Sequence, residues 1–172
     1  TGGAGYIGSV LAYHLYNLNH TVIIYDNLSL TNNQNIINCI FIKGNILDKK
    51  KIDYTFKKYN PELIIHLAAL SYVNESIKNP NKYYNVNVTG TINILDAMIN
   101  NNIKNIIYSS SCSVYGNSNS IITENINTNP ISPYGHSKLI SEIILKDYSK
   151  TYNFNYFILR YFNVAGADLE NK

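Results

Sequence analysis

Short apolar stretches alternate along the chain with longer stretches in which apolar residues recur every three or four positions. Apolar runs of strand length, rich in isoleucine and bounded by polar residues, are typical of buried parallel strands. The spacing of the longer stretches predicts helices that cross from one strand to the next. The expected strands are residues 21–25, 39–42, 63–67, 105–108 and 156–159, and the expected helices are residues 7–16, 52–59, 83–99 and 133–152.

This alternation predicts the α/β class, a doubly wound parallel sheet of Rossmann type with helices on both faces. We expect residues 1–172 to form one domain, because this length suits a single core and neither a repeat nor a linker divides the chain. Thr1 stands inside a glycine-rich turn of the kind that follows a strand. We therefore expect the first strand of the fold to precede Thr1, and the chain to be a fragment of a longer protein.

The composition is that of a folded domain, with 45% hydrophobic and 15% charged residues. A net charge of +3 is too weak to indicate a nucleic-acid partner, and the basic run 49–51 is interpreted as solvated helix surface. Cys39 and Cys112 lie in apolar runs, which favours free thiols and a cytoplasmic location. No apolar run reaches the roughly 20 residues of a membrane span, and the four histidines lack the spacing of metal ligands.

A glycine-rich turn opens the chain and indicates a dinucleotide site. Gly2, Gly5 and Gly8 precede the first expected helix with the spacing G-x-x-G-x-x-G. Glycine permits a tight turn and close backbone approach, and the N–H groups at a helix start attract a pyrophosphate. Asp26 ends the next expected strand, where a carboxylate accepts from both hydroxyls of an adenosine ribose and repels a 2′-phosphate. The pattern predicts NAD rather than NADP as the cofactor.

The ends of the next two expected strands add further candidates for cofactor binding. Ligands of open parallel sheets bind beyond the carboxyl ends of the strands. Asn45 and Ile46 follow one strand, and the stretch 67–71 follows the next, with small residues at positions 68 and 69 that let a cofactor lie against the backbone. The candidates in this stretch are Leu67, Ala68, Ala69 and Ser71. A capping asparagine and close helix packing are the alternative interpretation.

A tyrosine and a lysine four residues apart are the catalytic candidates. Ser132 and Pro133 are typical of a helix start, so Tyr134 and Lys138 should share one helix face. We expect the lysine ammonium, together with an oxidised nicotinamide, to lower the pKa of the Tyr134 phenol from about 10 toward neutrality. Tyr134 would then take a proton from a sugar hydroxyl as hydride leaves the same carbon. Ser111 is expected to hydrogen-bond the reacting oxygen. Taken alone, such a pair is more often packing.

With these motifs in this order, the chain resembles the extended short-chain dehydrogenase/reductase family, and within it the UDP-glucose 4-epimerases. The resemblance covers essentially all 172 residues, and residues 159–167 are its most specific stretch. It implies cofactor contacts by Tyr6, Ile7, Asp26, Asn27, Leu28, Asn45, Ile46 and Phe162, support of the active-site backbone by Asn87, a triad of Ser111, Tyr134 and Lys138, and a substrate contact by Asn163.

The resemblance also implies an activity. The C4 atom of a UDP-hexose is oxidised, the 4-keto sugar rotates, and the same retained NADH reduces its other face, which interconverts UDP-glucose and UDP-galactose. The implied partners are the UDP-sugar and a second copy of the chain. The region that grips uridine and sugar in the family follows Lys172, so we expect the fragment to be inactive alone.

Four positions depart from the patterns of related enzymes. Asn45 stands where family members usually have aspartate, and Ser71 replaces a lysine found in many epimerases. Cys112 and Ser113 stand where nucleotide-sugar 4,6-dehydratases place an Asp-Glu acid pair, which argues against dehydration. Epimerases of uronate or N-acetylated sugars remain alternatives. A non-catalytic NAD-binding protein is another, although such proteins typically lose the tyrosine or the lysine.

Overall fold

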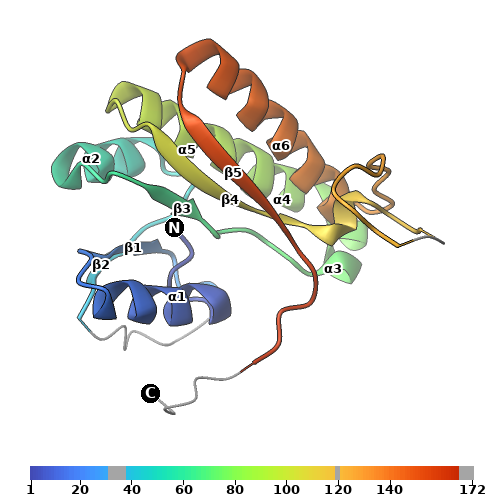
Figure 1. Ribbon diagram of the computed structural model, residues 1–172, viewed down its shortest axis with the longest axis horizontal. Coiled ribbons are helices and arrows are strands. Elements are labelled where there is room, and N and C mark those ends of the chain that lie inside the picture. The colour runs from blue at the N-terminus through green and yellow to red at the C-terminus, as the bar shows by residue number, and fades with distance from the viewer. Residues whose placement is uncertain (31–37, 119–120, 167–172) are drawn as a thin grey trace.

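The computed structural model describes residues 1–30, 38–118 and 121–166, and it has the alternating α/β order expected from the sequence (Figure 1). The strands are β1 (Ile23–Asp26), β2 (Ile40–Lys43), β3 (Ile64–His66), β4 (Asn105–Ser111) and β5 (Asn155–Tyr161). The α-helices are α1 (Tyr6–Asn17), α2 (Lys49–Tyr59), α3 (Val73–Lys78), α4 (Pro80–Tyr83), α5 (Gly90–Asn100) and α6 (Pro133–Tyr152). A π-helical turn η1 (Tyr84–Thr89) joins α4 to α5, and a 3₁₀ turn η2 (Cys112–Val114) follows β4.

The strands form two parallel sheets rather than the single sheet expected. β1 pairs with β2, and β3, β4 and β5 pair in that order. The backbone of Thr1 and Gly2 lies between the two sheets. The Thr1 nitrogen donates to the Ile65 carbonyl (2.7 Å), the Leu67 N–H donates to the Thr1 carbonyl (3.0 Å), and the Gly2 N–H donates to the Tyr25 carbonyl (3.0 Å). These bonds join both sheets at the place where the sequence predicts the first strand.

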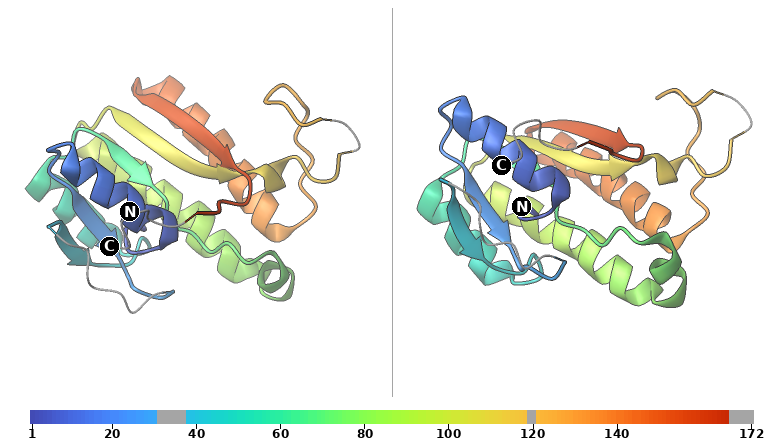
Figure 2. Two further views of the ribbon diagram at one scale, coloured as in Figure 1. Left: turned by 60° about the horizontal axis from the view of Figure 1, so that its bottom comes forward. Right: turned by 90° about the horizontal axis from the view of Figure 1, so that it is seen from below.

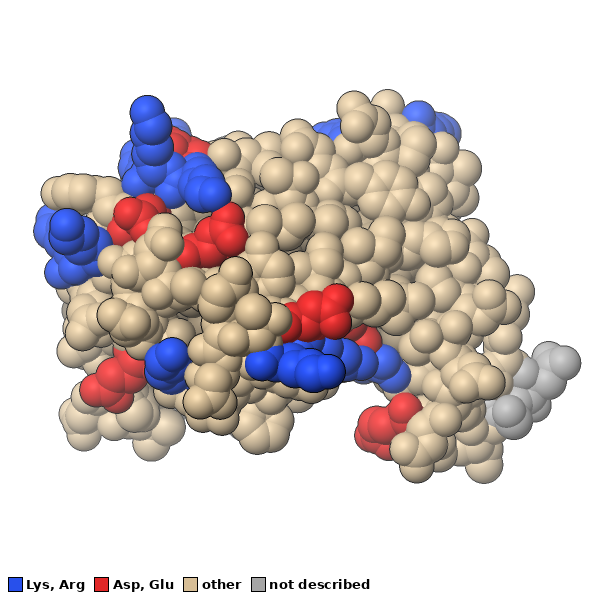
Figure 3. Space-filling model, turned by 90° about the horizontal axis from the view of Figure 1, so that it is seen from above, with Lys and Arg blue, Asp and Glu red and all other residues tan. Residues whose placement is uncertain are grey.

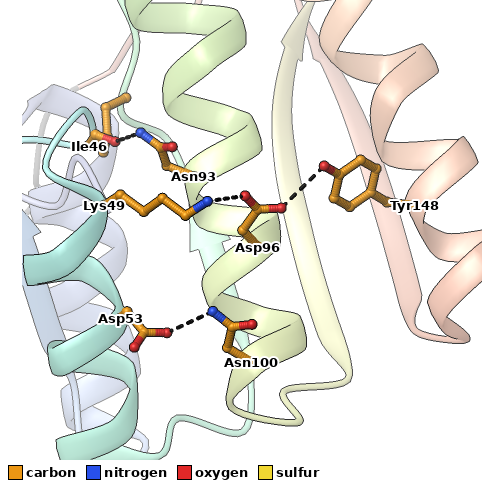
Figure 4. A network of polar contacts seen from close by, with 7 residues as sticks. All are labelled: Ile46, Lys49, Asp53, Asn93, Asp96, Asn100 and Tyr148. Atoms are coloured by element: carbon orange, nitrogen blue, oxygen red, sulfur yellow. Dashed lines mark hydrogen bonds and ion pairs between the residues drawn. The ribbon is translucent and has the colours of Figure 1, made fainter.

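Helices cover both faces of the strands, as predicted. Figure 2 shows α1 on one side and α2, α5 and α6 on the other. On the second side, Asp96 of α5 ties its two neighbours together, because its carboxylate accepts from the Lys49 ammonium of α2 (2.7 Å) and from the Tyr148 hydroxyl of α6 (3.2 Å; Figure 4). The three helices thus form one connected layer behind the strands.

The core lies between this helical layer and the strands. Its fully buried side chains include Ile94, Leu95 and Met98 of α5 and Ile106 of β4. Burying an aliphatic side chain of this size contributes about 1.5–3 kcal/mol relative to exposure. This packing fixes α5 against the centre of the three-stranded sheet.

Most strand and helix boundaries shift by one to three residues from the sequence-based expectation, and the larger changes concern helix α2 and the helix expected over residues 83–99. Helix α2 begins three residues earlier, because the Asp48 side chain caps it by accepting from the Lys51 N–H (3.0 Å). The basic run 49–51 is therefore exposed helix surface, as predicted. The helix expected over residues 83–99 is interrupted by η1, and the short helices α3 and α4 were not expected.

No helix in the described ranges combines the length and apolar character that crossing a bilayer requires. Cys39 and Cys112 are free thiols and are partly exposed. The described residues also bring together no group of three or more His, Cys, Asp or Glu side chains that could hold a metal ion.

Candidate active site

The glycine turn before α1 is shaped by close backbone contacts. Gly2 has a φ of +74°, and a Cβ atom there would lie 2.5 Å from the Ala68 nitrogen. A Cβ atom at Gly8 would lie 2.3 Å from the Gly2 carbonyl oxygen. Gly5 is the N-cap of α1, and no side chain caps the helix start. The turn therefore offers helix N–H groups to an anion, as a pyrophosphate site requires.

Asp26 lies at the carboxyl end of β1, where its carboxylate hydrogen-bonds both the glycine turn and the turn that follows β1. Its Oδ2 atom accepts from the Ala4 N–H (3.1 Å) in the glycine turn, and its Oδ1 atom accepts from the Leu28 N–H (2.8 Å). Leu28 has a φ of +60°. The exposed Asn27 accepts from the Ser29 N–H through its Oδ1 atom (3.0 Å). Each carboxylate oxygen has a further lone pair, so Asp26 can still accept from ribose hydroxyls. The sequence did not reveal its second task of fixing the glycine turn.

The two residues predicted to contact adenine have different surroundings. Asn45 is exposed, and its Oδ1 atom accepts from the Leu47 N–H (2.9 Å). Ile46 is buried, packs against Gly90 and accepts from Asn93 through its carbonyl oxygen (3.0 Å; Figure 4). The Ile46 side chain is therefore largely part of the core. Its contact with adenine stays a prediction, which its backbone N–H or the small exposed part of the side chain would make.

Asn87 links the segment after β3 to helix α6. It is buried in the π-helical turn, where its Oδ1 atom accepts from the Leu70 N–H (2.8 Å). Its Nδ2 atom donates to the Leu70 carbonyl (3.0 Å) and to the Ser137 hydroxyl (2.9 Å). Single π-helical turns are frequent at functional sites. These bonds fit the backbone-supporting role expected of Asn87, and they hold the stretch 67–71 beside the glycine turn.

Helix α6 begins as its sequence predicts and brings Tyr134 to Ser111. The Ser132 hydroxyl caps the helix by accepting from the Gly135 N–H (3.1 Å). Tyr134 is buried, with 8% of its surface exposed, and its phenol lies near the Ser111 hydroxyl at the end of β4. A Cβ atom at Gly135 would lie 2.6 Å from the Ser113 carbonyl oxygen, so this glycine lets α6 approach the strand end closely.

Lys138 is buried one turn later on α6, and its ammonium is directed at the strand. Its Nζ atom donates to the Ser109 carbonyl (2.7 Å) and lies 5.1 Å from the centre of the Tyr108 ring. Burial lowers the pKa of Lys138 to about 7, against the opposing effect of Glu142. His136, between Tyr134 and Lys138 in the sequence, is exposed.

The protein groups do not give Tyr134 the acidity expected from the sequence. Burial raises the pKa of the Tyr134 phenol, and the nearby Ser111 hydroxyl only partly opposes this effect. The expectation that Lys138 and an oxidised nicotinamide together lower this pKa stays a prediction, because the ammonium hydrogen-bonds the Ser109 carbonyl and not the phenol. Among the residues that the structure describes, no positive charge is directed at the phenol to replace it.

The remaining candidates follow β5. Phe162 and Asn163 are exposed beyond its carboxyl end, and the Tyr6 hydroxyl donates to the Gly166 carbonyl in the same segment. Position 167, the last of the family-specific stretch, lies outside the described residues. Because β1, β3, β4 and β5 belong to parallel sheets, their carboxyl ends carry the predicted site residues at one edge, where ligands of such folds bind.

Two buried groups near this edge were not assigned by the sequence analysis. His66 links the two sheets to α5, because its ring nitrogens hydrogen-bond the hydroxyls of Thr1 (2.8 Å) and Thr91 (3.1 Å). Burial keeps its pKa well below the usual value, which leaves it neutral. The second group is a fully buried carboxylate, Glu142, paired with Arg160. Its only sequence signal is its position one helical turn after Lys138.

Comparisons with known proteins agree with the geometry of this edge. The family profile described as "NAD dependent epimerase/dehydratase family" matches residues 1–172. A UDP-glucose 4-epimerase of Rhizobium meliloti is 39% identical over 99% of this chain and 52% of its own length. The crystal structure of UDP-glucose 4-epimerase from Brucella ovis in complex with NAD has a TM-score of 0.95 and 45% identity, covering 98% of this chain and 52% of that one.

A third relative acts on more than one sugar. The structure of the UDP-Glc/GlcNAc 4-epimerase from Campylobacter jejuni has a TM-score of 0.91 and 35% identity, covering 98% of this chain and 54% of that one. In each of these three comparisons the chain spans about half the length of its relative.

Proposed function

Because the chain belongs to the NAD dependent epimerase/dehydratase family, we propose that it is the NAD-binding domain of an enzyme that epimerises C4 of a UDP-hexose. The reaction would interconvert UDP-glucose and UDP-galactose through a 4-keto sugar. The observation that carries the proposal is the pair of buried, neighbouring side chains of Ser111 and Tyr134. This pair lies at the same strand edge as the glycine turn, as a hydroxyl reacting beside a nicotinamide requires.

The described residues fit NAD. The positive φ of Gly2 and the uncapped start of α1 suit a pyrophosphate, and the Asp26 carboxylate suits the two hydroxyls of an adenosine ribose. When bound, NAD supplies the acceptor and donor of hydride, and the protein supplies positioning and proton transfer. A 2′-phosphate would be repelled by the Asp26 charge, which supports NAD over NADP.

Proton transfer falls to Tyr134. Its phenolate would take the proton of the C4 hydroxyl as hydride leaves, and the phenol would return a proton to the 4-keto oxygen during reduction. Ser111 would hold the reacting oxygen by a hydrogen bond. Since burial raises the pKa of Tyr134, the positive charge of the oxidised nicotinamide is needed to stabilise the phenolate. Proton removal is then favoured only when the hydride acceptor is in place.

The assay for this proposal uses the complete protein. It should convert UDP-galactose to UDP-glucose without added cofactor if NAD is retained during purification. UDP-N-acetylgalactosamine is the second substrate to test, because the relatives include an enzyme named for both kinds of sugar. Conversion of neither sugar would remove UDP-hexose epimerisation as the function. Release of water from a 6-hydroxyl substrate would instead indicate a dehydratase, despite Cys112 and Ser113 in η2.

We also propose that the enzyme is a homodimer in the cytoplasm. Helix α6 leaves Ile140 and Ile143 exposed on its outer surface, at 37% and 50%. Figure 3 looks onto the side of the molecule where α6 lies, and much of this side carries few charged residues. Such a face favours association. Ile143→Glu should convert a dimer to a monomer in sedimentation velocity, and a monomeric unsubstituted protein would contradict the proposal. The free thiols Cys39 and Cys112 support the cytoplasm, which fractionation can test.

A further inference from the structure

A buried ionic cluster connects α6, β4 and β5 behind the proposed active site. Glu142 has 0% of its surface exposed. Its Oε1 atom accepts from the Ser110 hydroxyl and from Arg160 Nε (3.0 Å), and its Oε2 atom accepts from Arg160 Nη2 (2.7 Å). The guanidinium also donates to the Tyr115 hydroxyl (3.0 Å) and lies 4.9 Å from the centre of that ring. Every oxygen of the carboxylate is thus engaged, as a buried charge requires.

The cluster contacts the strand segment that forms the site. Ser110, the partner of Glu142, lies between Ser109, whose carbonyl accepts from Lys138, and Ser111, whose hydroxyl lies near the Tyr134 phenol. A carboxylate that fixes Ser110 against α6 therefore fixes both neighbouring contacts. A displacement of β4 relative to α6 would disturb the tyrosine and the lysine together.

The carboxylate is also the anion that acts on Lys138. The two residues are one helical turn apart on α6, where side chains face the same side. Burial disfavours the charge of Lys138, and Glu142 opposes this effect. Around Lys138, the Tyr108 ring faces it from β4, and the buried His66 lies on the β3 side.

Most of the other charged groups near α6 have partners of their own. On the elements packed against α6, these groups include Glu75, Lys82, Tyr83, Tyr84, Asp96, Cys112 and Arg160. Glu75 pairs with Lys82, and Asp96 pairs with Lys49. Tyr83 donates to Glu75, and Arg160 binds Glu142 itself. Among the described residues, Glu142 is therefore the carboxylate that opposes the loss of charge that burial imposes on Lys138.

We propose that Glu142, anchored by Arg160 and Ser110, is a positioning residue of the reaction that keeps Lys138 charged and holds β4 in register with α6. The catalytic part of this inference rests on the proposed function, because the lysine charge supports proton transfer only in the proposed epimerase reaction. The effect of Glu142 on the charge of Lys138 does not depend on the proposed function. A charged Lys138 near the site favours the Tyr134 phenolate at longer range, even though the two side chains are not hydrogen-bonded.

The test is the variant Glu142→Gln in the full-length, NAD-loaded protein. The titration midpoint of Lys138 is followed by NMR with labelled lysine, and its signal is identified as the one lost in Lys138→Met. We expect the midpoint to fall by about one pH unit or more, because the variant removes the counter-charge and leaves Arg160 unpaired. An unchanged midpoint would overturn the proposal, whether or not the protein turns over UDP-sugars.

Two further variants separate charge from structure. Glu142→Asp keeps the charge and should leave the midpoint within a few tenths of a pH unit of the original. If Glu142→Gln does not fold, the double variant Glu142→Gln with Arg160→Met removes both charges, which buried pairs often tolerate. Its midpoint should also be lower than in the original protein, and an equal midpoint would again contradict the proposal.

Kinetics give a second readout once UDP-galactose turnover is established. In Glu142→Gln the alkaline limb of the kcat–pH profile should move to lower pH, because Lys138 loses its proton earlier. Asp96→Asn is the matched control, since it breaks a different ion pair, the one that joins Asp96 of α5 to Lys49 of α2 (Figure 4). Its profile should not move. A wild-type enzyme without turnover would refute the proposed function and leave the NMR result to decide this inference.

Discussion

The Nζ atom of Lys138 lies 2.7 Å from the carbonyl oxygen of Ser109, while the phenol of Tyr134, one helical turn earlier, lies near the hydroxyl of Ser111, two residues farther along the same strand. The spacing of four residues on α6 is thus matched to a spacing of two residues on β4. Each side chain has its own partner at the strand end. The pair acts through the shared register of helix and strand and not through a direct bond between phenol and ammonium.

Tyr134→Phe should lower turnover of UDP-galactose by a factor of about 10²–10⁴ in the complete protein, because the general base is lost. NAD should remain bound, since the ring and its edge contact with Tyr83 are kept. The measurement is the rate of UDP-glucose formation together with the NAD content of the purified protein. Tyr152→Phe, at the far end of α6, is the control. Equal rates for Tyr134→Phe and the control would exclude Tyr134 as the base.

Lys138→Met should abolish activity and increase stability at low pH. The folded protein lowers the pKa of Lys138 from 10.5 to about 7, so burial of the charge destabilises the fold fully below pH 7. This cost, on the order of a few kcal/mol, disappears as the pH rises from about 7 toward 10.5. The variant should therefore melt at higher temperature than the original at pH 6, and the difference should shrink by pH 9.5. A lower melting temperature at pH 6 would show that the ammonium contact with Ser109 outweighs desolvation.

Gly2→Ala should destabilise the domain by about 1–3 kcal/mol, because the residue has a positive φ and its Cβ atom would meet the Ala68 backbone. Gly5→Ala is the matched comparison for stability. Its Cβ atom would have its closest contact at 3.5 Å, from the Gly2 carbonyl oxygen, which is an ordinary separation. Urea unfolding of both variants measures the difference. Equal loss of stability would contradict the close approach of Gly2 to Ala68.

Asp26→Asn should weaken NAD binding by about 10-fold or more, since hydrogen bonds to a charged group contribute roughly 1.5–3 kcal/mol. An amide can accept through one oxygen only, so either the Ala4 or the Leu28 contact would also be lost. Discrimination against NADP should fall, because the repelling charge is gone. Calorimetric titration with both dinucleotides gives the two affinities. An unchanged ratio of the affinities would place the ribose elsewhere.

The parts of the fold that local chemistry specifies were predictable from the sequence. Helix α6 has the bounds expected, Pro133–Tyr152, because Ser132 caps its start and Asn153 ends it in a left-handed conformation. Strand β4 extends to Ser111, beyond its expected end at Tyr108. The prediction ended too early because the three serines after Tyr108 resemble the polar boundary of a strand. They are tolerated inside the molecule where Ser110 bonds Glu142.

Long-range relationships were not predictable in the same way. Glu142 and Arg160 lie on different elements, and no periodic pattern relates them. The direction of the Lys138 ammonium depends on the register between α6 and β4, which spacing within one helix does not define. The burial of Ile46 likewise depends on the approach of Gly90. Sequence motifs therefore identified which residues gather at the strand edge, while tertiary packing determined what each side chain contacts.

The backbone hydrogen bonds of Thr1 and Gly2 make the glycine turn the connection between the β1–β2 sheet and the β3–β4–β5 sheet. A dinucleotide bound at the glycine turn would contact both sheets at once, so its binding free energy would stabilise their association. Unfolding should then become more cooperative as the ligand concentration rises. Hydrogen exchange in the glycine turn should slow together with exchange in β1 and β3. The dinucleotide would thus stabilise the fold as well as take part in the reaction.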